Sequence, residues 1–185
     1  RDRLKDNMWG YNRHTDQTVN IYSAFLQNEW KNDRWGILIG GRLDKHNMVD
    51  NVIFSPRANL RFNPTQNINL RLSYSSGFRA PQAFDEDMHI ENVGGTVAMI
   101  ERAKDLKEEK SQSFSVSADM YHRFGAFQTN LLIEGFYTRL TDVFVLGKPY
   151  DRGDGILVKT RSNGPGAKVM GLTLEGKVAY LSILQ

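Results

Sequence analysis

Apolar and polar residues alternate over long stretches of this chain. In residues 53–62 one set of alternating positions includes Phe54, Ala58, Leu60 and Phe62, and the other holds Ser, Arg and Asn. The same alternation recurs in residues 67–75, 113–121 and 172–180, and less regularly in 18–30, 35–44, 127–145 and 156–162. Successive side chains of a β-strand point to opposite faces, so each segment predicts a strand with one apolar and one polar face.

The connections between these strands alternate in length. Short turns are predicted at residues 31–34, 63–66 and 123–125, and longer links at 45–51, 77–110 and 147–155. Barrels of outer membranes have tight turns at one end and long loops at the other, a rule that soluble β-sandwiches do not follow. The pattern predicts an all-β fold, an antiparallel up-and-down meander of about 7–8 strands. The last strand is expected to run from about residue 156 to 180 and to bend at Ser162-Asn163-Gly164-Pro165-Gly166, since Gly-Pro-Gly within a strand marks a bulge or break.

Composition narrows the function classes. The 185 residues contain no Cys, which excludes a disulfide scaffold, a zinc ribbon and thiol chemistry. The 24 basic and 21 acidic residues give a net charge of +3 without a basic cluster, so nucleic-acid binding has little support. No apolar run approaches the roughly 18 residues of a membrane-spanning helix, but a membrane-spanning strand needs only about 9–11.

Four motifs carry a family resemblance. They are Gly77-Phe78-Arg79-Ala80-Pro81; Leu106-Lys107-Glu108-Glu109-Lys110-Ser111; Gly135-Phe136-Tyr137-Thr138-Arg139-Leu140-Thr141-Asp142; and Asn163-Gly164 with Gly171-Leu172-Thr173-Leu174-Glu175-Gly176. In their order and spacing they resemble the C-terminal part of the β-barrel domain of a TonB-dependent outer-membrane receptor. Glu108 departs from the family pattern, in which Pro is usual. Thr173 and Glu175 depart slightly from the usual placing of the acid.

The resemblance implies a fold and a function. It implies a segment of a 22-stranded transmembrane β-barrel, with residues 1–185 forming a partial barrel domain and the plug domain, TonB box and signal peptide absent. It implies TonB-dependent uptake of a scarce large ligand of the ferric siderophore, haem or cobalamin type, at the bacterial outer membrane. The fragment alone would be transport-incompetent. The expected partners are the rest of its own barrel, the plug domain, TonB through the missing N-terminal part, the lipid bilayer and the imported small molecule.

The two faces of the predicted strands have opposite environments in such a barrel. An Arg or Lys that faces lipid at the membrane midplane costs about 2–4 kcal/mol, so the ionic side chains are expected to face the lumen. Phe78, Trp30, Trp35 and Tyr74 are expected near the membrane interfaces. The lumen set is Arg42, Asp44, Arg57, Arg61, Arg71, Asp119, Glu134, Glu175 and Lys177.

A candidate ligand-binding site lies in the longest predicted loop. If this loop is extended, Asp85, Asp87, His89 and Glu91 share one face, and their oxygens and imidazole suit contact with a cation or an iron complex. The same spacing also fits a solvated acidic loop. A short helix is expected within residues 96–110 from the near-helical spacing of apolar residues.

Other functions remain as alternatives. No catalytic motif is present, so the chain is not expected to be an enzyme, and no cofactor or resident metal is expected. Arg152-Gly153-Asp154 matches an adhesion tripeptide but is expected to be a turn. The main alternative is a soluble β-sandwich or lipocalin-like ligand-binding module; a third class is an outer-membrane barrel enzyme or adhesin.

Overall fold

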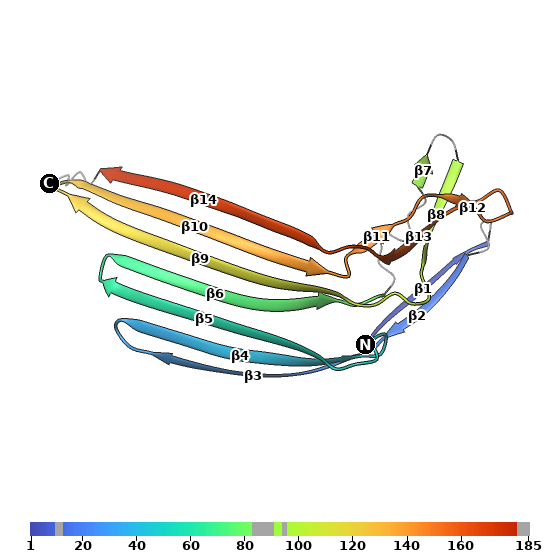
Figure 1. Cartoon of the computed structure of the whole chain (residues 1–185), viewed down its shortest axis with the longest axis horizontal. Helices are drawn as coiled ribbons and strands as arrows, with labels where there is room; N and C mark the ends of the chain where they lie inside the picture. The colour runs from blue at the N-terminus through green and yellow to red at the C-terminus, as the bar shows by residue number, and fades with distance from the viewer. Residues whose placement is uncertain (10–12, 83–90, 94–95, 181–185) are drawn as a thin grey trace.

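A computed structural model of the chain describes residues 1–9, 13–82, 91–93 and 96–180. Its main element is a seven-stranded antiparallel sheet with the strand order β14-β10-β9-β6-β5-β4-β3 (Figure 1). The strands are β3 (Ile21–Lys31), β4 (Trp35–His46), β5 (Ile53–Thr65), β6 (Ile68–Arg79), β9 (Glu109–Phe124), β10 (Phe127–Thr141) and β14 (Ala167–Tyr180). Each strand pairs with its neighbour in the meander, which confirms the predicted up-and-down topology.

The tight turns and the long connections lie at opposite ends of this sheet. The β3–β4, β5–β6 and β9–β10 turns gather at one end, on the left of Figure 1, and the connections from β4, β6 and β10 leave from the other. The alternation of short and long links is therefore confirmed. We call these the turn end and the loop end.

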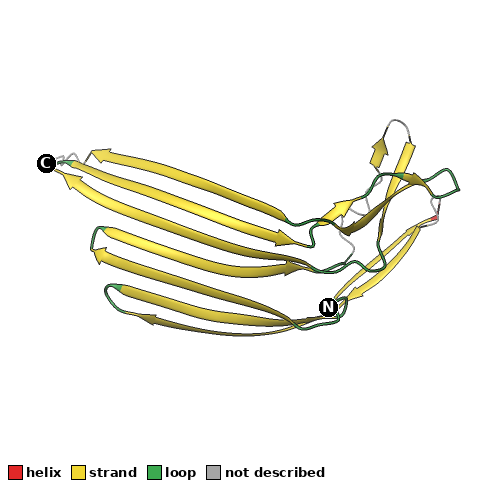
Figure 2. Ribbon diagram, viewed as in Figure 1, coloured by secondary structure: helices red, strands yellow, loops and turns green. Residues whose placement is uncertain are grey.

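Two smaller sheets stand at the loop end (Figure 2). One is the hairpin of β1 (Asp2–Met8) and β2 (Arg13–Val19). The other contains β7 (Glu91–Val93), β8 (Thr96–Arg102), β11 (Phe144–Leu146), β12 (Tyr150–Asp151) and β13 (Leu157–Asn163). Its strands β8 and β13 are parallel, with Val158 beside Met99.

Three local predictions are wrong. Residues 156–180 are not one bent strand, because β13 joins the loop-end sheet and only β14 pairs with β10. Residues 127–145 divide into β10 and β11. Residues 96–102 form β8 rather than a helix, because they find a strand partner in β13. Within the described ranges, no helix has the length and apolarity needed to cross a membrane.

Packing is concentrated at the loop end. The buried hydrophobic residues of the described chain are Val19, Val49, Ile53, Ala80, Met99 and Val158, which all lie in or beside the loop-end connections and small sheets. Phe78 packs against Val49, Ile53 and Ala80, so it is part of this loop-end cluster. No second sheet covers the apolar face of the seven strands within the part that the structure describes. A β-sandwich would bury that face against a second layer, so this alternative loses its support.

Candidate functional site

Strand register sorts the seven strands into two chemically different faces. Residues that pair across antiparallel strands point to the same side of a sheet. One such row joins Leu60, Leu72 and Val116, and the next joins Leu70, Ala118, Ile133 and Leu174. We call this the apolar face. Its side chains are exposed, with Val116 at 59% and Leu174 at 69%.

The opposite face, called here the polar face, holds the ionic side chains. Register places Arg61, Arg71, Ser117 and Glu134 in one row, and Asn69, Asp119, Leu132 and Glu175 in another. The predicted separation of Leu60, Leu70, Val116 and Leu174 from Arg57, Arg71 and Glu175 is therefore confirmed. A few apolar side chains lie on the polar face, and Phe136 is one of them. Its ring lies over Gly171, so close that a Cβ at position 171 would stand 2.6 Å from the ring.

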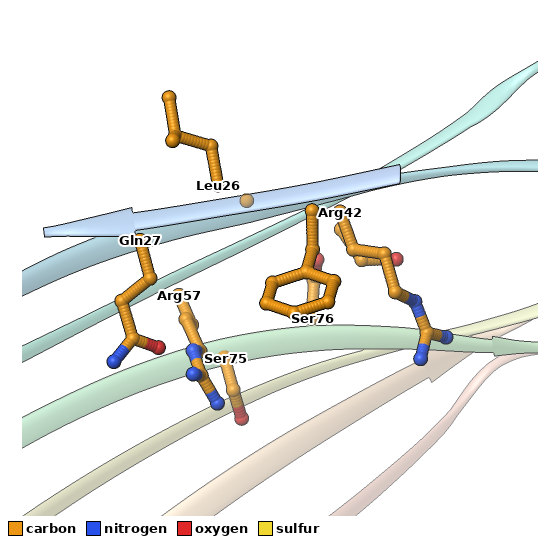
Figure 3. A pocket seen from close by; sticks show the side chains of 9 residues that line it. Leu26, Gln27, Arg42, Arg57, Ser75 and Ser76 are labelled. Atoms are coloured by element: carbon orange, nitrogen blue, oxygen red, sulfur yellow. The ribbon is translucent and has the colours of Figure 1, made fainter. Parts of the chain in front are cut away.

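A hollow on the polar face gathers side chains from four strands. Figure 3 shows Gln27, Arg42 and Arg57 extending to the same side of the sheet, while Leu26 extends to the other. With Ser55 and Ser75 they line a space of about 410 Å³, which we call the arginine hollow. Gln27 and Arg57 are both paired with Gly40, whose missing side chain leaves room between them.

The arginines of the hollow are held differently. Arg42 Nε donates to Asp44 Oδ2 at 2.7 Å, and Asp44 is almost fully buried at 1% exposure. Ser23 Oγ donates to the other carboxylate oxygen of Asp44. Arg57 is exposed, and in the described part of the chain no carboxylate lies within ion-pair distance of it. The hollow therefore offers guanidinium and hydroxyl donors that suit an anionic or oxygen-rich partner.

Asn163 joins three segments at the loop end. Its Nδ2 donates to the carbonyls of Lys107 and Asp142 at 3.0 and 2.7 Å, and its Oδ1 accepts from the Lys107 amide at 2.8 Å. Glu109 Oε2 accepts a second hydrogen bond in this region, from the Phe144 amide. Asn163 therefore links three of the four motifs noted in the sequence, because Lys107, Asp142 and Asn163 each belong to a different one.

The Gly164-Pro165-Gly166 segment is where the chain leaves one sheet for another. The Gly164 amide donates to the Val143 carbonyl at 2.7 Å. A Cβ on Gly164 would stand 2.6 Å from Val145, and a Cβ on Gly166 would stand 2.6 Å from the Leu140 carbonyl oxygen. Glycine is required at 166 by the close approach of the Leu140 carbonyl, and at 164 the Val145 side chain leaves no room for a Cβ. The segment connects β13 to β14 and so marks the crossing point between the two sheets.

His46 and Asn47 anchor the neighbouring connection. His46 is fully buried, its Nδ1 accepts from the Met48 amide at 3.0 Å, and its Nε2 lies 3.3 Å from Gln82 Oε1. Asn47 Oδ1 accepts from the Asn20 amide, and its Nδ2 donates to the Thr18 carbonyl. Sequence reasoning did not single out either residue, because their partners are distant in the chain.

The predicted ligand residues are mostly outside the described chain. Asp85, Asp87 and His89 lie outside the described residues, and for Glu91 the structure gives only its backbone place in β7. Among the residues that are described, no three His, Asp or Glu side chains gather as a metal site requires. The prediction about these four residues is therefore untested.

Arg152-Gly153-Asp154 forms a turn, as predicted. Arg152 Nη2 and Nε both donate to Asp154 Oδ2, and Gly153 has a φ of 102°. This hydrogen bond from Arg152 holds the pKa of the Asp154 carboxyl below its ordinary value. Arg152 also contacts Glu101 at 3.4 Å, which ties the turn to β8.

Comparison with solved structures identifies the architecture. The chain is similar to the siderophore receptor PirA from Pseudomonas aeruginosa, with a TM-score of 0.71 and 17% identity over 89% of this chain and 32% of that one. It is similar to the ferric enterobactin receptor PfeA from the same organism, with a TM-score of 0.66 and 20% identity over 88% of this chain and 25% of that one. A third similar structure is the FrpB iron transporter from Neisseria meningitidis, with a TM-score of 0.63 and 19% identity over 91% and 25% of the two chains.

These likenesses describe part of a larger fold. The chain spans only a quarter to a third of the length of these receptors. No curated protein matches the chain. The profile of the family "TonB dependent receptor-like, beta-barrel" matches residues 3–184, nearly the whole sequence. The chain belongs to the family of TonB-dependent receptor β-barrels.

Proposed function

We propose that this chain forms part of the wall of a TonB-dependent outer-membrane receptor, with its apolar face against lipid and its polar face toward the lumen. The single observation that carries the proposal is the two-faced sheet: exposed Leu, Ile, Val and Met side chains cover one side, and ionic side chains lie on the other. A water-soluble protein rarely leaves so broad an apolar surface exposed. Hydrocarbon is the solvent that this surface fits.

The height of the apolar face agrees with a bilayer. On β10 the outward residues run from Phe127 at the turn end to Tyr137 near the loop end. At about 3.4 Å per residue these ten steps span roughly 34 Å along the strand. A strand tilted by about 45° then rises roughly 24 Å, close to the apolar band of about 25 Å in membrane barrels.

Aromatic rings lie toward both ends of this band. Near the turn end, Trp35 stacks on Phe62 with ring centroids 4.2 Å apart, and Phe127 contacts Tyr180 at 5.1 Å. Toward the loop end, Tyr74 contacts Phe114 at 4.8 Å. Aromatic side chains are favoured at membrane interfaces, which supports this orientation in the bilayer.

The two edge strands of the main sheet have one unpaired side each. β3 and β14 are the two outer strands of the main sheet, and each pairs on one side only. Long unpaired edges invite association with other strands. We take their partners to be the neighbouring strands of the same barrel, with a plug domain filling the lumen and TonB acting on the N-terminal part of the receptor.

The imported ligand is inferred by analogy. The similar structures are named as a siderophore receptor, a ferric enterobactin receptor and an iron transporter. A scarce large ligand of the ferric siderophore, haem or cobalamin type follows for this chain, and no enzymatic role is proposed. The loop residues Asp85, Asp87, His89 and Glu91 are proposed as ligand contacts on their chemistry alone.

The test uses the full-length receptor in its own cells. We expect it to fractionate with the outer membrane, and we expect its deletion to abolish TonB-dependent growth on one member of a panel of iron chelates, haem and corrinoids. Alanine at positions 85, 87, 89 and 91 together is expected to weaken uptake of that ligand without lowering receptor abundance. A receptor found in the soluble fraction, or a deletion with unchanged uptake across the panel, would refute the proposal.

A further inference from the structure

Two cations stand side by side at the loop-end margin of the apolar face. Register pairs Arg139 of β10 with Lys168 of β14, and each lies two residues nearer the loop end than Tyr137 and Met170 of the same strands. Since side chains two positions apart on a strand share a face, Arg139 and Lys168 lie on the apolar face. Both residues are exposed. Like charges directly opposite on neighbouring strands destabilise a sheet, so this pair favours an anionic partner.

The described part of the chain supplies no such anion. Within the described residues, no carboxylate lies within ion-pair distance of Arg139 or Lys168. A third cation of the same face, Lys110, pairs with Glu108 at 3.0 Å. The charge of Arg139 and Lys168 is therefore not neutralised by any residue that the structure describes.

The turn-end margin of the apolar face has no comparable pair. Its last two rows join Phe124, Phe127 and Tyr180, and then His122, Thr129 and Val178. Neither row contains Lys or Arg. In membrane barrels the long loops face the outside, so the proposed orientation places Arg139 and Lys168 among the headgroups of the outer leaflet. A cation costs little at that depth, in contrast to the midplane.

A groove in the apolar face begins next to these cations and runs toward the middle of the sheet. It has a volume of about 600 Å³ and surrounds Gly135. Gly135 is four residues from Arg139 on the same face of β10, or roughly 14 Å along the strand. The apolar side chains that line the groove come from four strands and are Leu72, Phe114, Val116, Tyr137, Met170 and Leu172.

The glycine at the centre of this groove is not required by packing. A Cβ on Gly135 would meet its nearest neighbours, atoms of Val116, Gly171 and Leu172, at 3.9 to 4.0 Å, which is ordinary contact. The missing side chain therefore leaves open apolar space and does not relieve a clash. In a surface that faces hydrocarbon, an acyl chain is the group that fills such a space.

We propose that Arg139 and Lys168 bind the phosphate of an acylated lipid of the outer leaflet, while one acyl chain of that lipid lies in the groove at Gly135. This inference rests on the proposed function, which places the apolar face against lipid. Guanidinium and ammonium groups both bind phosphate, and the headgroup and chain of a phospholipid follow each other in the same order as the cations and the groove. A free phosphate or an uncharged lipid would use only half of this site.

Lipid binding to the full-length receptor in detergent tests the two halves separately. Native mass spectrometry compares phosphatidic acid, diacylglycerol with the same chains, and glycerol 3-phosphate. We expect phosphatidic acid to bind at least about tenfold more tightly than either of the others, because it alone engages both the cations and the groove. Equal affinity for glycerol 3-phosphate would mean a phosphate site without a lipid, and equal affinity for diacylglycerol would mean unspecific apolar contact. Either result overturns the inference.

Charge variants test the cations. Arg139→Gln with Lys168→Gln is expected to weaken phosphatidic acid binding at least about tenfold, whereas Arg139→Lys with Lys168→Arg keeps both charges and most of the binding. The matched control is Arg71→Gln with Lys177→Gln, which removes the same charge from the polar face. An equal loss in this control would show that net charge alone decides, and it would refute the assignment.

The groove is tested by filling it. Gly135→Leu places an apolar side chain in the open space and is expected to weaken phosphatidic acid binding at least about fivefold with all charges kept. Gly176→Leu is its control, because Gly176 also lies on the apolar face and a Cβ there meets nothing within 4 Å. Unchanged binding in the Gly135 variant refutes the placing of the chain. A receptor absent from the outer membrane refutes the proposed function and this inference together, whereas a receptor in the outer membrane that binds all three probes equally refutes this inference alone.

Discussion

The two-faced wall makes a sharp prediction about one pair of adjacent residues. Leu132 and Ile133 have isomeric side chains and are adjacent in β10, yet they lie on opposite faces of the sheet. Ile133 sits in the apolar row between Ala118 and Leu174, whereas Leu132 lies between Asp119 and Glu175. Arginine at position 133 would therefore enter lipid, and arginine at position 132 would enter a polar lumen beside two acids.

The magnitude follows from the depth in the bilayer. Ile133 lies between Phe127 and Tyr137, the two ends of the outward row on β10, near the middle of the apolar band. Arginine facing lipid at the midplane costs about 2–4 kcal/mol and much less near the interfaces. At about 1.4 kcal/mol per tenfold change, Ile133→Arg should lower the folded-to-unfolded ratio by roughly 30-fold to several hundred-fold. Leu132→Arg should cost far less, because it adds a cation beside Asp119 and Glu175.

The assay compares both variants in the same full-length receptor. Guanidinium unfolding in phospholipid vesicles, followed by tryptophan fluorescence, gives the two midpoints, and the protease-resistant receptor in outer membranes gives the assembled yield. Ile133→Arg is expected to lower both, with Leu132→Arg close to wild type. A larger loss for Leu132→Arg would show that the two faces are assigned the wrong way round. Equal losses would show that positions 132 and 133 do not differ in environment.

Four smaller predictions concern packing and the loop end. Asn163→Ala removes three hydrogen bonds, so hydrogen exchange at Lys107 should rise; unchanged exchange would contradict the bridging role. Gly166→Ala pushes a Cβ against the Leu140 carbonyl and should destabilise the receptor, whereas Gly176→Ala meets nothing within 4 Å and serves as its thermal-unfolding control. Gly171→Ala collides with the Phe136 ring, so adding Phe136→Leu should recover stability, and a strictly additive double mutant would refute this contact. Because Arg152 lowers the pKa of Asp154, their pairing persists above the ordinary carboxyl pKa and is lost as acid brings the pH through the lowered value. The loss is measured as reduced protection of the Ile156 amide, which donates to Asp154 Oδ1, relative to its intrinsic exchange rate at each pH.

The wall was predictable because its signals are local. Period-two alternation gives each strand its two faces, and short turns fix which strands are neighbours, so Leu60 and Arg61 could be assigned to opposite sides without coordinates. The β5–β6 turn shows that such signals place a turn only to within a few residues. It was predicted at residues 63–66 but forms at Gln66-Asn67, since the chain continues as a strand past Pro64 with a register shift between Phe62 and Thr65.

The loop end was not predictable because its partners are distant. Apolar spacing in residues 96–110 fits a helix or a strand equally, and pairing with β13, which lies more than fifty residues later, decided for a strand. The same holds for His46 with Gln82 and for Asn163 with Lys107. No periodicity records such contacts, and a single sequence gives no other sign of them.

The two ends of the molecule therefore depend on different solvents. At the loop end, Met99, Val158 and His46 are buried by other segments of the same chain, so their contribution to stability does not depend on lipid. The wall buries almost nothing by itself: the side chains of its apolar face contact neighbours within one layer and leave their outer surface open. In the proposed barrel its stability comes from lipid on the apolar face and from neighbouring strands that pair with β3 and β14.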